Sequence, residues 1–446
     1  MLELRGKRVL VLGLGLSGRS AARFCATRGA EVVAAEERPA DRVAGLEAIP
    51  PGVELRLGAP FPDPAPFDLV VPSPGVPAAR WRERARRAWG DLELAWRALE
   101  IPILAITGTN GKSTTTRLVE AMLRAAGLRA RAAGNVGTPV LDLVGEALDA
   151  LVLEVSSFQL EATEGFRPRV AVVLNVTPDH LDRHGSVEAY AATKERILCR
   201  QEPTDAAVLS FDDPLVRAMA DRTRARVVPF STRGPLERGA CLDTGAALLR
   251  EPGRPPLRVP LADLRLEGAH NRENALAALA AVWAFGVDPL RAASALAGFQ
   301  GLPHRAEAVA SVRGVLYVND SKGTNPGAAC RALEGFAGPL VWIAGGRDKG
   351  LDFSELAACA EGRVRAVVLI GEAADKLAAA LAGRVEVHRA AALDEAVKRA
   401  AELARPGDVV LLSPACASQD QFRDFEERGE RFRQAVSALA GAGGMR

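Results

Sequence analysis

Short apolar runs alternate with longer amphipathic stretches along most of the chain. In its first part, strand-like runs at 8–12, 31–34 and 68–71 surround a helical stretch from about Gly18 to Arg28. Apolar runs of this length, bounded by turns, are typical of strands that are buried on both faces of a parallel sheet. The first segment therefore predicts a doubly wound α/β unit.

The alternation continues through a second segment. Buried strands are predicted at 101–106, 150–155 and 170–176, and an Ala/Leu-rich helix is predicted over 274–285. The Pro/Arg/Gly-rich stretch 232–260 is expected to hold irregular strands. These elements again predict a mostly parallel sheet with helices between the strands.

The pattern breaks around Gly298 to Pro303, and a third α/β segment follows. Its elements are predicted as strands at 315–318, 340–344, 366–370 and 409–412 with helices between them, such as 393–404. A chain of 446 residues exceeds what one core usually supports. We therefore predict three α/β domains, the first and third Rossmann-like and the central one built around a phosphate loop. Their expected boundaries are 1–97, 98–301 and 302–446.

Composition and charge narrow the class of protein. The chain is 48% hydrophobic and has a net charge of +2 without a long basic run, so no nucleic-acid partner is expected. No window approaches the roughly 20 apolar residues of a membrane span, and the N-terminus favours a strand over a signal peptide. Six scattered cysteines without a CxxC pair argue against a disulfide framework and favour a reducing compartment. We expect a cytoplasmic protein, and a monomer.

The strongest motif lies between a predicted strand and a predicted helix. Glycines at 108 and 111 let backbone N–H groups converge on phosphate oxygens at the positive end of a helix. Lys112 is expected to reach the outer phosphates, and the hydroxyl of Ser113 to bind Mg²⁺. Ile106 occupies a position where the usual P-loop has glycine, so this loop is a variant. The alternative is a tight turn with a chance lysine. The predicted loop consists of Gly108, Thr109, Asn110, Gly111, Lys112, Ser113 and Thr114.

A second glycine-rich turn, Gly13 to Gly18, follows the first predicted strand. With Glu36 at the end of the next strand it matches the dinucleotide fingerprint, which alone would suggest a nicotinamide-dependent dehydrogenase. The signal is weak, because such glycines suit any diphosphate near a helix N-terminus. The ligand of this turn therefore stays open at this point.

Acidic and basic side chains follow the buried strands of the second segment. Glu154 ends one strand and is placed to hold Mg²⁺, and His180 follows another. Each has a simpler alternative: Glu154 can be a buried ion-pair partner, and His180 an ordinary loop histidine.

The motifs become recognisable in combination. GTNGKST at 108–114, EVSSFQL at 154–160, NVTPDHLDRH at 175–184 and Tyr190-x-x-x-Lys194 together resemble the Mur ligase superfamily. The resemblance implies a ligase that activates a carboxylate as an acyl phosphate at the expense of ATP.

The same resemblance implies two Mg²⁺ ions. Glu154 would bind one and His180 would help to bind the other, with Ser113 as a further ligand. Lys194 would be carbamylated by CO₂, which turns an amine into a carboxylate-like ligand that arginine could not replace. The alternative for Lys194 is a surface lysine paired with Glu195 or another acid.

Further motifs extend the implied ATP site. Asn271 and Asn274 stand on one side of a helix start and would face the adenine, although capping of that helix is an alternative role. Arg305, in LPHR, would contact nucleotide phosphates. Asp320 is also implied to bind ATP.

The string NDSKGTNP at 319–326 discriminates among the superfamily. It resembles the members that add D-glutamate to UDP-N-acetylmuramoyl-L-alanine, whereas sister ligases and folylpolyglutamate synthases carry other strings. A dicarboxylate substrate requires a cation and hydroxyl donors. The residues implied for D-glutamate are Thr324, Lys349, Ser418 and Phe425. A lysine that merely closes a Gly-rich turn is the alternative for Lys349.

In the first segment, the resemblance assigns the glycine turn to the UDP diphosphate. Glu-Glu-Arg stands at 36–38 where the family often has Asp-Thr-Arg, which affects the uracil contacts. The residues implied for the UDP substrate are Gly15, Leu16, Ser17, Glu36, Arg38, Ser73, Gly75 and Asn135.

Three rival functions remain to be weighed: a folylpolyglutamate synthase, a dehydrogenase and a non-catalytic nucleotide-binding module. Folylpolyglutamate synthases lack the NDSK string, and a dehydrogenase would need no ATP. A non-catalytic module would not need Glu154, His180 and Lys194 together. Because the implied ligands come from three domains, we also expect the domains to close before chemistry.

Overall fold

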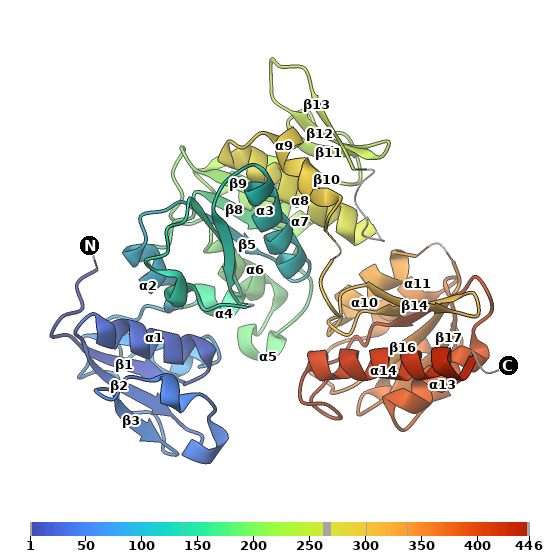
Figure 1. Cartoon of the computed structure of the whole chain (residues 1–446), viewed down its shortest axis with the longest axis horizontal. Helices are drawn as coiled ribbons and strands as arrows, with labels where there is room; N and C mark the ends of the chain where they lie inside the picture. Colours follow the sequence, from blue (N-terminus) through green and yellow to red (C-terminus); the bar gives the residue numbers. More distant parts are fainter. Residues whose placement is uncertain (1, 136, 262–268, 300, 337, 444–446) are drawn as a thin grey trace. The chain divides into compact units, whose positions relative to one another are not determined.

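Most strands belong to three mainly parallel sheets (Figure 1). The structure is a computed structural model that describes residues 2–135, 137–261, 269–299, 301–336 and 338–443. The chain forms two compact units. The first unit consists of Met1–Val176, Gly185–Asp263 and Ala275–Ala297, and the second of Thr177–His184, Leu264–Asn274 and Gly298–Arg446.

The first sheet has the order β3-β2-β1-β4, and all its strands are parallel. The apolar runs correctly predicted three of them, but Glu54–Leu57 was not predicted because this edge strand is largely exposed. The strands are β1 (Arg8–Leu12), β2 (Glu31–Glu36), β3 (Glu54–Leu57) and β4 (Leu69–Pro72), and helix α1 (Leu16–Thr27) follows β1.

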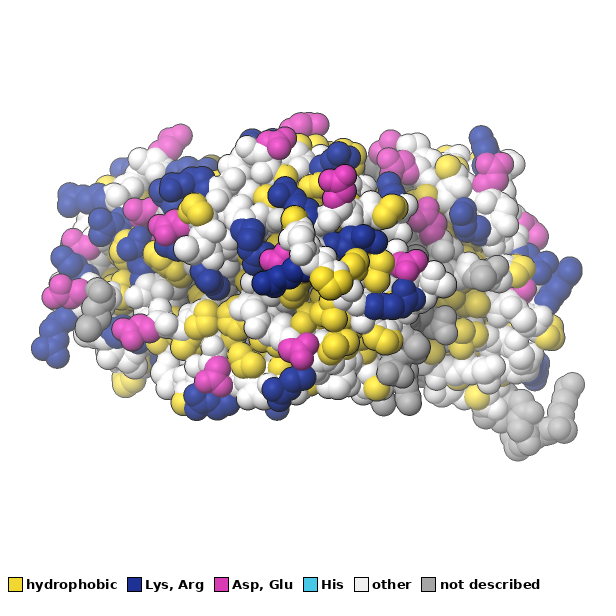
Figure 2. Space-filling model, turned by 90° about the horizontal axis from the view of Figure 1, so that it is seen from above, with side chains coloured by type: hydrophobic (Ala, Val, Ile, Leu, Met, Phe, Trp, Pro, Cys, Tyr) yellow, Lys and Arg dark blue, Asp and Glu magenta, His cyan; other side chains and the backbone are white. Residues whose placement is uncertain are grey.

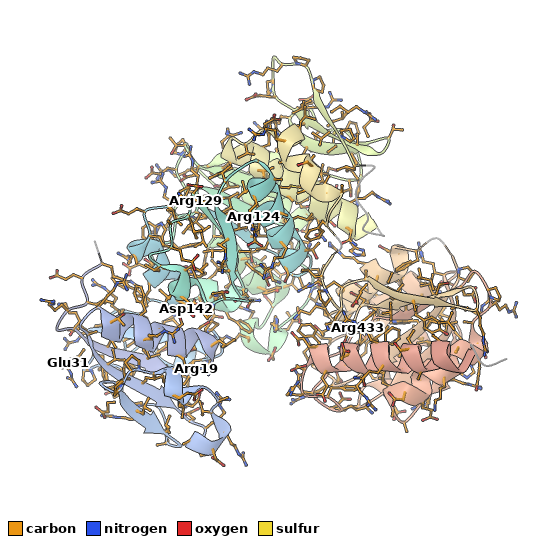
Figure 3. All side chains as sticks on the ribbon, viewed as in Figure 1. Arg19, Glu31, Arg124, Arg129, Asp142 and Arg433 are labelled. Carbon is orange, nitrogen blue, oxygen red and sulfur yellow. A yellow bond between two sulfur atoms is a disulfide. The ribbon has the colours of Figure 1, made fainter. Side chains whose placement is uncertain are left out.

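Polar contacts join this sheet to the rest of the first unit. Asp142 accepts hydrogen bonds from the Ser20 hydroxyl and the Arg23 guanidinium of α1, each at 2.6 Å. Figure 3 shows Asp142 beside α1. Glu93, in helix α2 (Asp91–Ala98), is fully buried and accepts from the backbone N–H groups of 164–166.

The second sheet has nine strands in the order β13-β12-β11-β10-β9-β8-β5-β7-β6. Its three edge strands β11 to β13 are antiparallel to one another and form the predicted 232–260 region, whereas the remaining pairs are parallel. The strands are β5 (Ile103–Thr107), β6 (Ala130–Gly134), β7 (Ala150–Glu154), β8 (Val170–Val173), β9 (Ala206–Ser210), β10 (Arg226–Ser231), β11 (Gly239–Asp243), β12 (Ala246–Arg250) and β13 (Leu257–Pro260).

Helices connect these strands. They include α3 (Lys112–Ala125), α4 (Ser157–Leu160), α5 (Leu181–His184), α6 (Val187–Glu195), α7 (Pro214–Arg217), α8 (Ala269–Phe285) and α9 (Pro289–Ala293). The predicted helix over 274–285 is the later part of α8, and the boundary between the two units falls within that helix.

The third sheet has the order β14-β15-β19-β16-β17-β18 and lies in the second unit. Only the β14–β15 pair is antiparallel. The strands are β14 (Glu307–Val312), β15 (Val315–Asn319), β16 (Leu340–Gly345), β17 (Val364–Ile370), β18 (Glu386–Arg389) and β19 (Val409–Leu412). The helices are α10 (Pro326–Glu334), α11 (Ser354–Ala360), α12 (Ala374–Leu381), α13 (Leu393–Leu403) and α14 (Phe425–Gly443). The predicted class, a mixed α/β fold with mostly parallel sheets, is therefore confirmed.

One expectation about cysteines needs correction. Cys330 and Cys359 form a disulfide with a Cα–Cα distance of 5.4 Å, although the scattered spacing argued against such links. Spacing along the chain could not reveal the pair, because the two helices that carry it meet only in the fold. The four other cysteines are free thiols.

Two surface properties bear on partners. In the part of the chain that the structure describes, no helix combines the length and the apolar character of a membrane span. On the face shown in Figure 2, basic and acidic side chains are interspersed.

Candidate active site

The predicted phosphate loop connects β5 to α3. Gly108 has a φ of +153°, and a Cβ at this position would lie 3.0 Å from the Cβ of Leu174 and 3.3 Å from the backbone nitrogen of Asn175. Helix α3 begins at Lys112, so its N-terminus faces the loop. The loop therefore has the close packing and the helix terminus that a phosphate site needs.

Asn175, just beyond β8, fixes the conformation of this loop. Its carbonyl accepts from Thr109 N at 2.9 Å, its side-chain oxygen accepts from Asn110 N at 2.8 Å, and its side-chain nitrogen donates to Asn110 O at 3.1 Å. Asn175 is 1% exposed. Asn175 is part of the motif at 175–184, but the motif alone predicted no role for it. A polar residue directly after a buried strand was the signal that could have found it.

Two lysines meet at one carbonyl oxygen of the loop. Lys112 Nζ donates to Gly108 O and Thr109 O at 2.9 Å each, and Lys194 Nζ donates to Gly108 O at 2.8 Å. Lys194 is 1% exposed and lies 4.3 Å from the centroid of the Tyr190 ring. Both predicted lysines thus reach the phosphate loop.

The alternative role of Lys194 as a surface lysine does not fit its surroundings. Its neighbour Glu195 pairs instead with Arg222, at 2.6 Å between Glu195 Oε1 and Arg222 Nε. Lys194 itself points into the protein from α6, where its amine is shielded from water.

Glu154 forms the acidic part of the same site. It ends β7 and is 3% exposed, Ser113 Oγ donates to its Oε2 at 2.5 Å, and Asn135 Nδ2 donates to its Oε1 at 2.9 Å. These two partners are neutral, which disfavours the alternative of an ion-pair carboxylate. A hydroxyl and a carboxylate beside a phosphate loop are oxygen ligands that suit Mg²⁺. Within the described residues there is no cluster of three or more His, Cys, Asp and Glu, so a site here depends on Ser113 and Lys194 as well.

His180 is a further residue predicted to bind a metal ion. It belongs to the second unit, whereas Glu154 and Lys194 belong to the first. Its φ is +52°, its side chain is 40% exposed, and its Nε2 lies 3.7 Å from Asp179 Oδ2. The predicted role of His180 at a shared metal site therefore stays a prediction.

Every residue predicted to bind the UDP substrate lines one cavity of about 550 Å³ in the first unit. A volume of this size is typical of a small-molecule site. Phe61, Pro77 and Gln159 also line it and were not predicted. Phe61 and Pro77 stand outside the quoted motifs, and Gln159 stands in the motif at 154–160 without a predicted role. The predicted lining residues are Gly15, Leu16, Ser17, Glu36, Arg38, Ser73, Gly75 and Asn135.

Glu36 fixes the glycine turn of this cavity. Its carboxylate accepts from Leu14 N at 2.9 Å and from the Arg38 guanidinium at 3.0 and 3.1 Å. Hydrogen bonds from Arg38 lower the pKa of Glu36 to about 2, although burial acts in the opposite direction. The Ser73 hydroxyl donates to Gly13 O at 2.7 Å. Glu36 and Ser73 thus position the turn and also line the cavity.

In the second unit, Asp179 joins two segments predicted to bind D-glutamate. Its Oδ1 accepts from Lys349 Nζ at 3.1 Å, and its Oδ2 accepts from Asn325 Nδ2 at 3.1 Å. Burial opposes ionisation of Asp179, but the charges of Lys349 and His180 hold its pKa below the usual value. Lys349 therefore does more than close a turn: its ammonium already binds a carboxylate.

Of the remaining predicted D-glutamate residues, Phe425 begins α14. Phe425 O accepts from Ser321 Oγ at 2.8 Å, and Lys322 Nζ lies 3.7 Å from the centroid of the Phe425 ring. Ser418 is 1% exposed and Thr324 directly precedes Asn325, which caps α10.

A buried arginine holds these loops together. Arg428 is fully buried and donates to Ser321 O at 2.8 Å, to Ser321 Oγ at 3.0 Å and to the carbonyls of Cys416 and Ala417 at 3.2 Å. Sequence reasoning missed Ser321 and Arg428, because their contacts join loops that are far apart in the chain.

The residues predicted for ATP include several in the second unit. Asn271 and Asn274 are 5% and 4% exposed and lie inside α8. Because α8 begins at Ala269, they do not occupy its N-cap position, so the capping alternative does not fit. Arg305 follows His304, whose φ is +62°.

Asp320, also predicted for ATP, is enclosed by its own domain. It accepts from Ser413 Oγ at 2.7 Å and from Ala306 N at 3.2 Å. Burial raises its pKa to about 6. These contacts give it a role in holding its loop, and its contact with a nucleotide stays a prediction.

Comparison with known proteins agrees with this geometry. The Mur ligase middle domain matches residues 106–282, and the Mur ligase glutamate ligase domain matches residues 304–416. The chain is 45% identical over 448 residues to the UDP-N-acetylmuramoylalanine--D-glutamate ligase of Geobacter metallireducens, which covers 98% of this chain and 99% of that protein. It is 46% identical over 445 residues to the enzyme of the same name from Pelotomaculum thermopropionicum, covering 97% and 98%.

Solved structures share the fold. The MurF ligase of Thermotoga maritima in complex with ADP has a TM-score of 0.62 at 18% identity and covers 99% of this chain and 100% of its own. A pseudomurein peptide ligase type C from Methanothermus fervidus has a TM-score of 0.61 at 18% identity, covering 97% and 100%.

Mainly parallel sheets with a phosphate loop at a strand end define a nucleotide-binding enzyme of the α/β class. The chain belongs to the Mur ligase family, and its curated relatives at 42–46% identity are the UDP-N-acetylmuramoylalanine--D-glutamate ligases.

Proposed function

We propose that this enzyme uses ATP to join D-glutamate to UDP-N-acetylmuramoyl-L-alanine in the synthesis of peptidoglycan precursors. The observation that carries the proposal is the identity of 45% with a ligase of that name, over nearly the full length of both chains. The NDSKGTNP string at 319–326 supports the choice of D-glutamate within the family.

In this proposal the UDP moiety binds in the cavity of about 550 Å³. The backbone around Leu16 and Ser17 receives the diphosphate at the N-terminus of α1, where N–H groups point outward. Glu36 and Arg38 form the nucleoside end of the cavity, and Asn135 stands beside Glu154 at the end that the muramoyl part would reach.

The phosphate loop and Lys112 receive the phosphates of ATP, with Asn271, Asn274, Arg305 and Asp320 completing the proposed nucleotide set. Lys112 supplies a positive charge where negative charge develops as the alanine carboxylate attacks the γ-phosphate. The product is an acyl phosphate, and its carbonyl carbon is then attacked by the amine of D-glutamate with loss of inorganic phosphate. Two steps turn a poor electrophile into a competent one.

Two Mg²⁺ ions are part of the proposal. When bound, Mg²⁺ would neutralise charge on the phosphate oxygens. Ser113 and Glu154 are the residues of the first unit that would hold it, with His180 proposed for the second ion. The side-chain oxygens of Ser113 and Glu154 suit a hard cation, and Ser113 Oγ lies 2.5 Å from Glu154 Oε2.

We further propose that Lys194 is carbamylated. The amine forms a bond with the carbon of CO₂ and loses a proton, and the resulting carbamate carries a negative charge. The burial of Lys194 and its position at Gly108 O support this role, because the added group would lie beside the phosphate loop. An arginine could not form such an adduct.

Thr324, Lys349, Ser418 and Phe425 form the proposed D-glutamate site. The contact of Lys349 with Asp179 supports its assignment, because an ammonium that binds one carboxylate can bind another in its place. The loops that carry Ser418 and Phe425 share the contacts of Arg428.

The organisation of the chain follows the same proposal. Domains at 1–97, 98–301 and 302–446 would bind the UDP substrate, ATP and D-glutamate, with Rossmann-like first and third domains. The strand order β3-β2-β1-β4 of the first sheet supports this assignment, since it matches the first four positions of the Rossmann order 3-2-1-4-5-6. A cytoplasmic monomer is proposed, in keeping with nucleotide substrates.

The test is phosphate release from ATP and Mg²⁺ with UDP-N-acetylmuramoyl-L-alanine, comparing D-glutamate with L-glutamate and other amino acids. We expect release that requires both the UDP substrate and D-glutamate. Release with L-glutamate and a folate instead would assign the chain to folylpolyglutamate synthesis. Silence in every combination would contradict ligation.

A further inference from the structure

The disulfide between Cys330 and Cys359 joins the two helices next to the proposed D-glutamate residues. Cys330 lies in α10, which begins directly after Thr324 and its cap Asn325, and Cys359 lies near the end of α11. The link spans a sequence separation of 29, and Lys349 lies inside the segment that it closes. Thr324 therefore lies just before one of the linked helices, and Lys349 lies just before the other.

The two sides already meet at one carboxylate. Asp179 accepts from Asn325 at one oxygen and from Lys349 at the other. The distance between α10 and α11 therefore bears on the distance between the residues expected to hold D-glutamate.

Helix α11 depends on its neighbours for its position. It has only seven residues, and the backbone N–H of Ser354 at its start donates to the Asp352 side chain at 2.9 Å. Helices of this length are not stable alone, so α11 is held by packing and by the covalent link. Its buried side chains Leu356 and Ala360 share a core with Leu333 of α10. Ala329 and Ala332 of α10 belong to the same core.

The pair is also chemically suited to exchange. Cys359 is half-buried and Cys330 is 9% exposed, so a thiolate can approach the bond from the side of Cys359. Burial raises the pKa of Cys25 and of Cys416 to about 12, which makes these two thiols poor nucleophiles. A disulfide in a protein that works among reducing thiols is usually catalytic or redox-sensing.

We propose that Cys330 and Cys359 form a redox-sensitive site whose oxidised state holds α11 against α10 and thereby sets the affinity of the D-glutamate site. This inference rests on the proposed function for the identity of the substrate. In the oxidation, each thiol loses a proton and a sulfur–sulfur bond forms. A small-molecule disulfide such as oxidised glutathione takes up the two electrons and two protons and is cleaved to two thiols.

The test uses the full-length enzyme equilibrated with mixtures of glutathione and oxidised glutathione. After quenching and alkylation of free thiols, mass spectrometry gives the fraction of molecules with the 330–359 link. The KM for each substrate is measured on the same samples. We expect the KM for D-glutamate to rise about fivefold on reduction, with the KM values for ATP and the UDP substrate unchanged.

Two variants sharpen the result. The double variant Cys330→Ser/Cys359→Ser should behave like the reduced enzyme at every ratio. Cys199→Ser, which removes the exposed thiol away from this pair, should keep the full response. If the double variant does not fold, the reduced and oxidised forms of the natural chain still provide the comparison.

Two results would overturn the proposal: a link that forms at no glutathione ratio, or a KM for D-glutamate that is the same in the linked and reduced forms. A failure of the proposed function looks different, because phosphate release would then not depend on D-glutamate in either form. In that case hydrogen exchange of the peptides from 346 to 360 decides whether the link holds α11, and equal exchange in both forms overturns it.

Discussion

Two glycine-rich turns in the first unit have the same local design and different chemistry. Gly13–Gly18 joins β1 to α1, and Gly108–Ser113 joins β5 to α3. Each has a cation bound to a carbonyl of the turn: Arg19 donates to Leu14 O at 2.8 Å, and Lys112 donates to Gly108 O at 2.9 Å. Figure 3 shows Arg19 at α1.

The surroundings of the two turns differ. The first is held by the carboxylate of Glu36 and the hydroxyl of Ser73, and it lines a cavity of about 550 Å³. The second adds Lys194 at Gly108 O and a carboxylate, Glu154, at Ser113. In the proposed function the backbone of both turns binds phosphate, whereas Lys112, Lys194 and Glu154 supply the charges proposed for phosphoryl transfer at the second.

The largest expected effect is a difference in kcat between substitutions of Lys112 and of Arg19. Lys112→Ala should lower kcat by about 10²- to 10³-fold, because it removes a charge from the site where charge develops in the transition state. Arg19→Ala, the matched change at the first turn, should leave kcat within about twofold and raise only the KM for the UDP substrate. Both are measured by phosphate release. Equal losses of kcat in the two variants would contradict the division of roles.

A second prediction concerns the packing of the first turn. A Cβ on Gly18 would lie 1.8 Å from Gly13 O and 2.6 Å from Ser73 Oγ, whereas a Cβ on Gly15 would meet nothing within 4 Å. Gly18→Ala should therefore lower the free energy of unfolding by about 2 to 3 kcal/mol, because backbone must move to admit the methyl group. Gly15→Ala should change it by less than about 0.5 kcal/mol. Urea denaturation of the two variants gives the comparison, and similar midpoints would show that the turn is not closely packed.

The third prediction concerns the support of the second turn. Asn175→Ala removes the two side-chain hydrogen bonds that hold Asn110 and keeps the bond from Thr109 N to the backbone carbonyl of residue 175. Loss of these two hydrogen bonds to the part-buried backbone of Asn110 should lower the free energy of unfolding by about 1 to 2 kcal/mol. We also expect a higher KM for ATP and an unchanged KM for the UDP substrate. A variant that loses stability with no change in the KM for ATP would show that Asn175 does not shape the nucleotide site.

The sequence predicted local features better than contacts between distant segments. The apolar runs located β1, β5 and β7 because strands buried on both faces have continuous hydrophobic side chains. The exposed edge strands β3 and β18 lack that signal and were not predicted. Complete burial was not sufficient, because the fully buried strand β9 was not predicted either.

The site shows the same limit. The glycine motifs and the lysines at 112 and 194 are visible in the sequence, because their chemistry requires particular residue types at particular spacings. Asn175, Arg428 and the Cys330–Cys359 link are not, because each acts through partners brought close only by folding. The family resemblance gave roles to individual residues but not the contacts that position them.

The smallest expected effect compares two carboxyls at strand ends, one beside the first turn and one in the third sheet. Glu36 ends β2 and has a pKa lowered to about 2, first by hydrogen bonds from Arg38. Asp320 follows β15 and has a pKa raised to about 6 by burial. Stability from Glu36 should be fully present above its unfolded pKa, 4.5, and be lost as the pH falls toward 2.

The contribution of Asp320 to stability should depend on pH in the opposite direction. Its favourable, protonated state is fully present below its unfolded pKa, 3.8, and stability is lost as the pH rises through 6. Glu36→Gln should therefore destabilise the protein at pH 7 and have little effect near pH 2. Asp320→Asn keeps one oxygen to accept from Ala306 N and places an NH₂ donor beside the Ser413 hydroxyl. It should be most favourable relative to the natural chain above pH 6. Urea midpoints measured from pH 3 to 8 give both slopes. Slopes of the same sign in the two variants would show that Arg38 and burial do not set the two pKa values as the geometry requires.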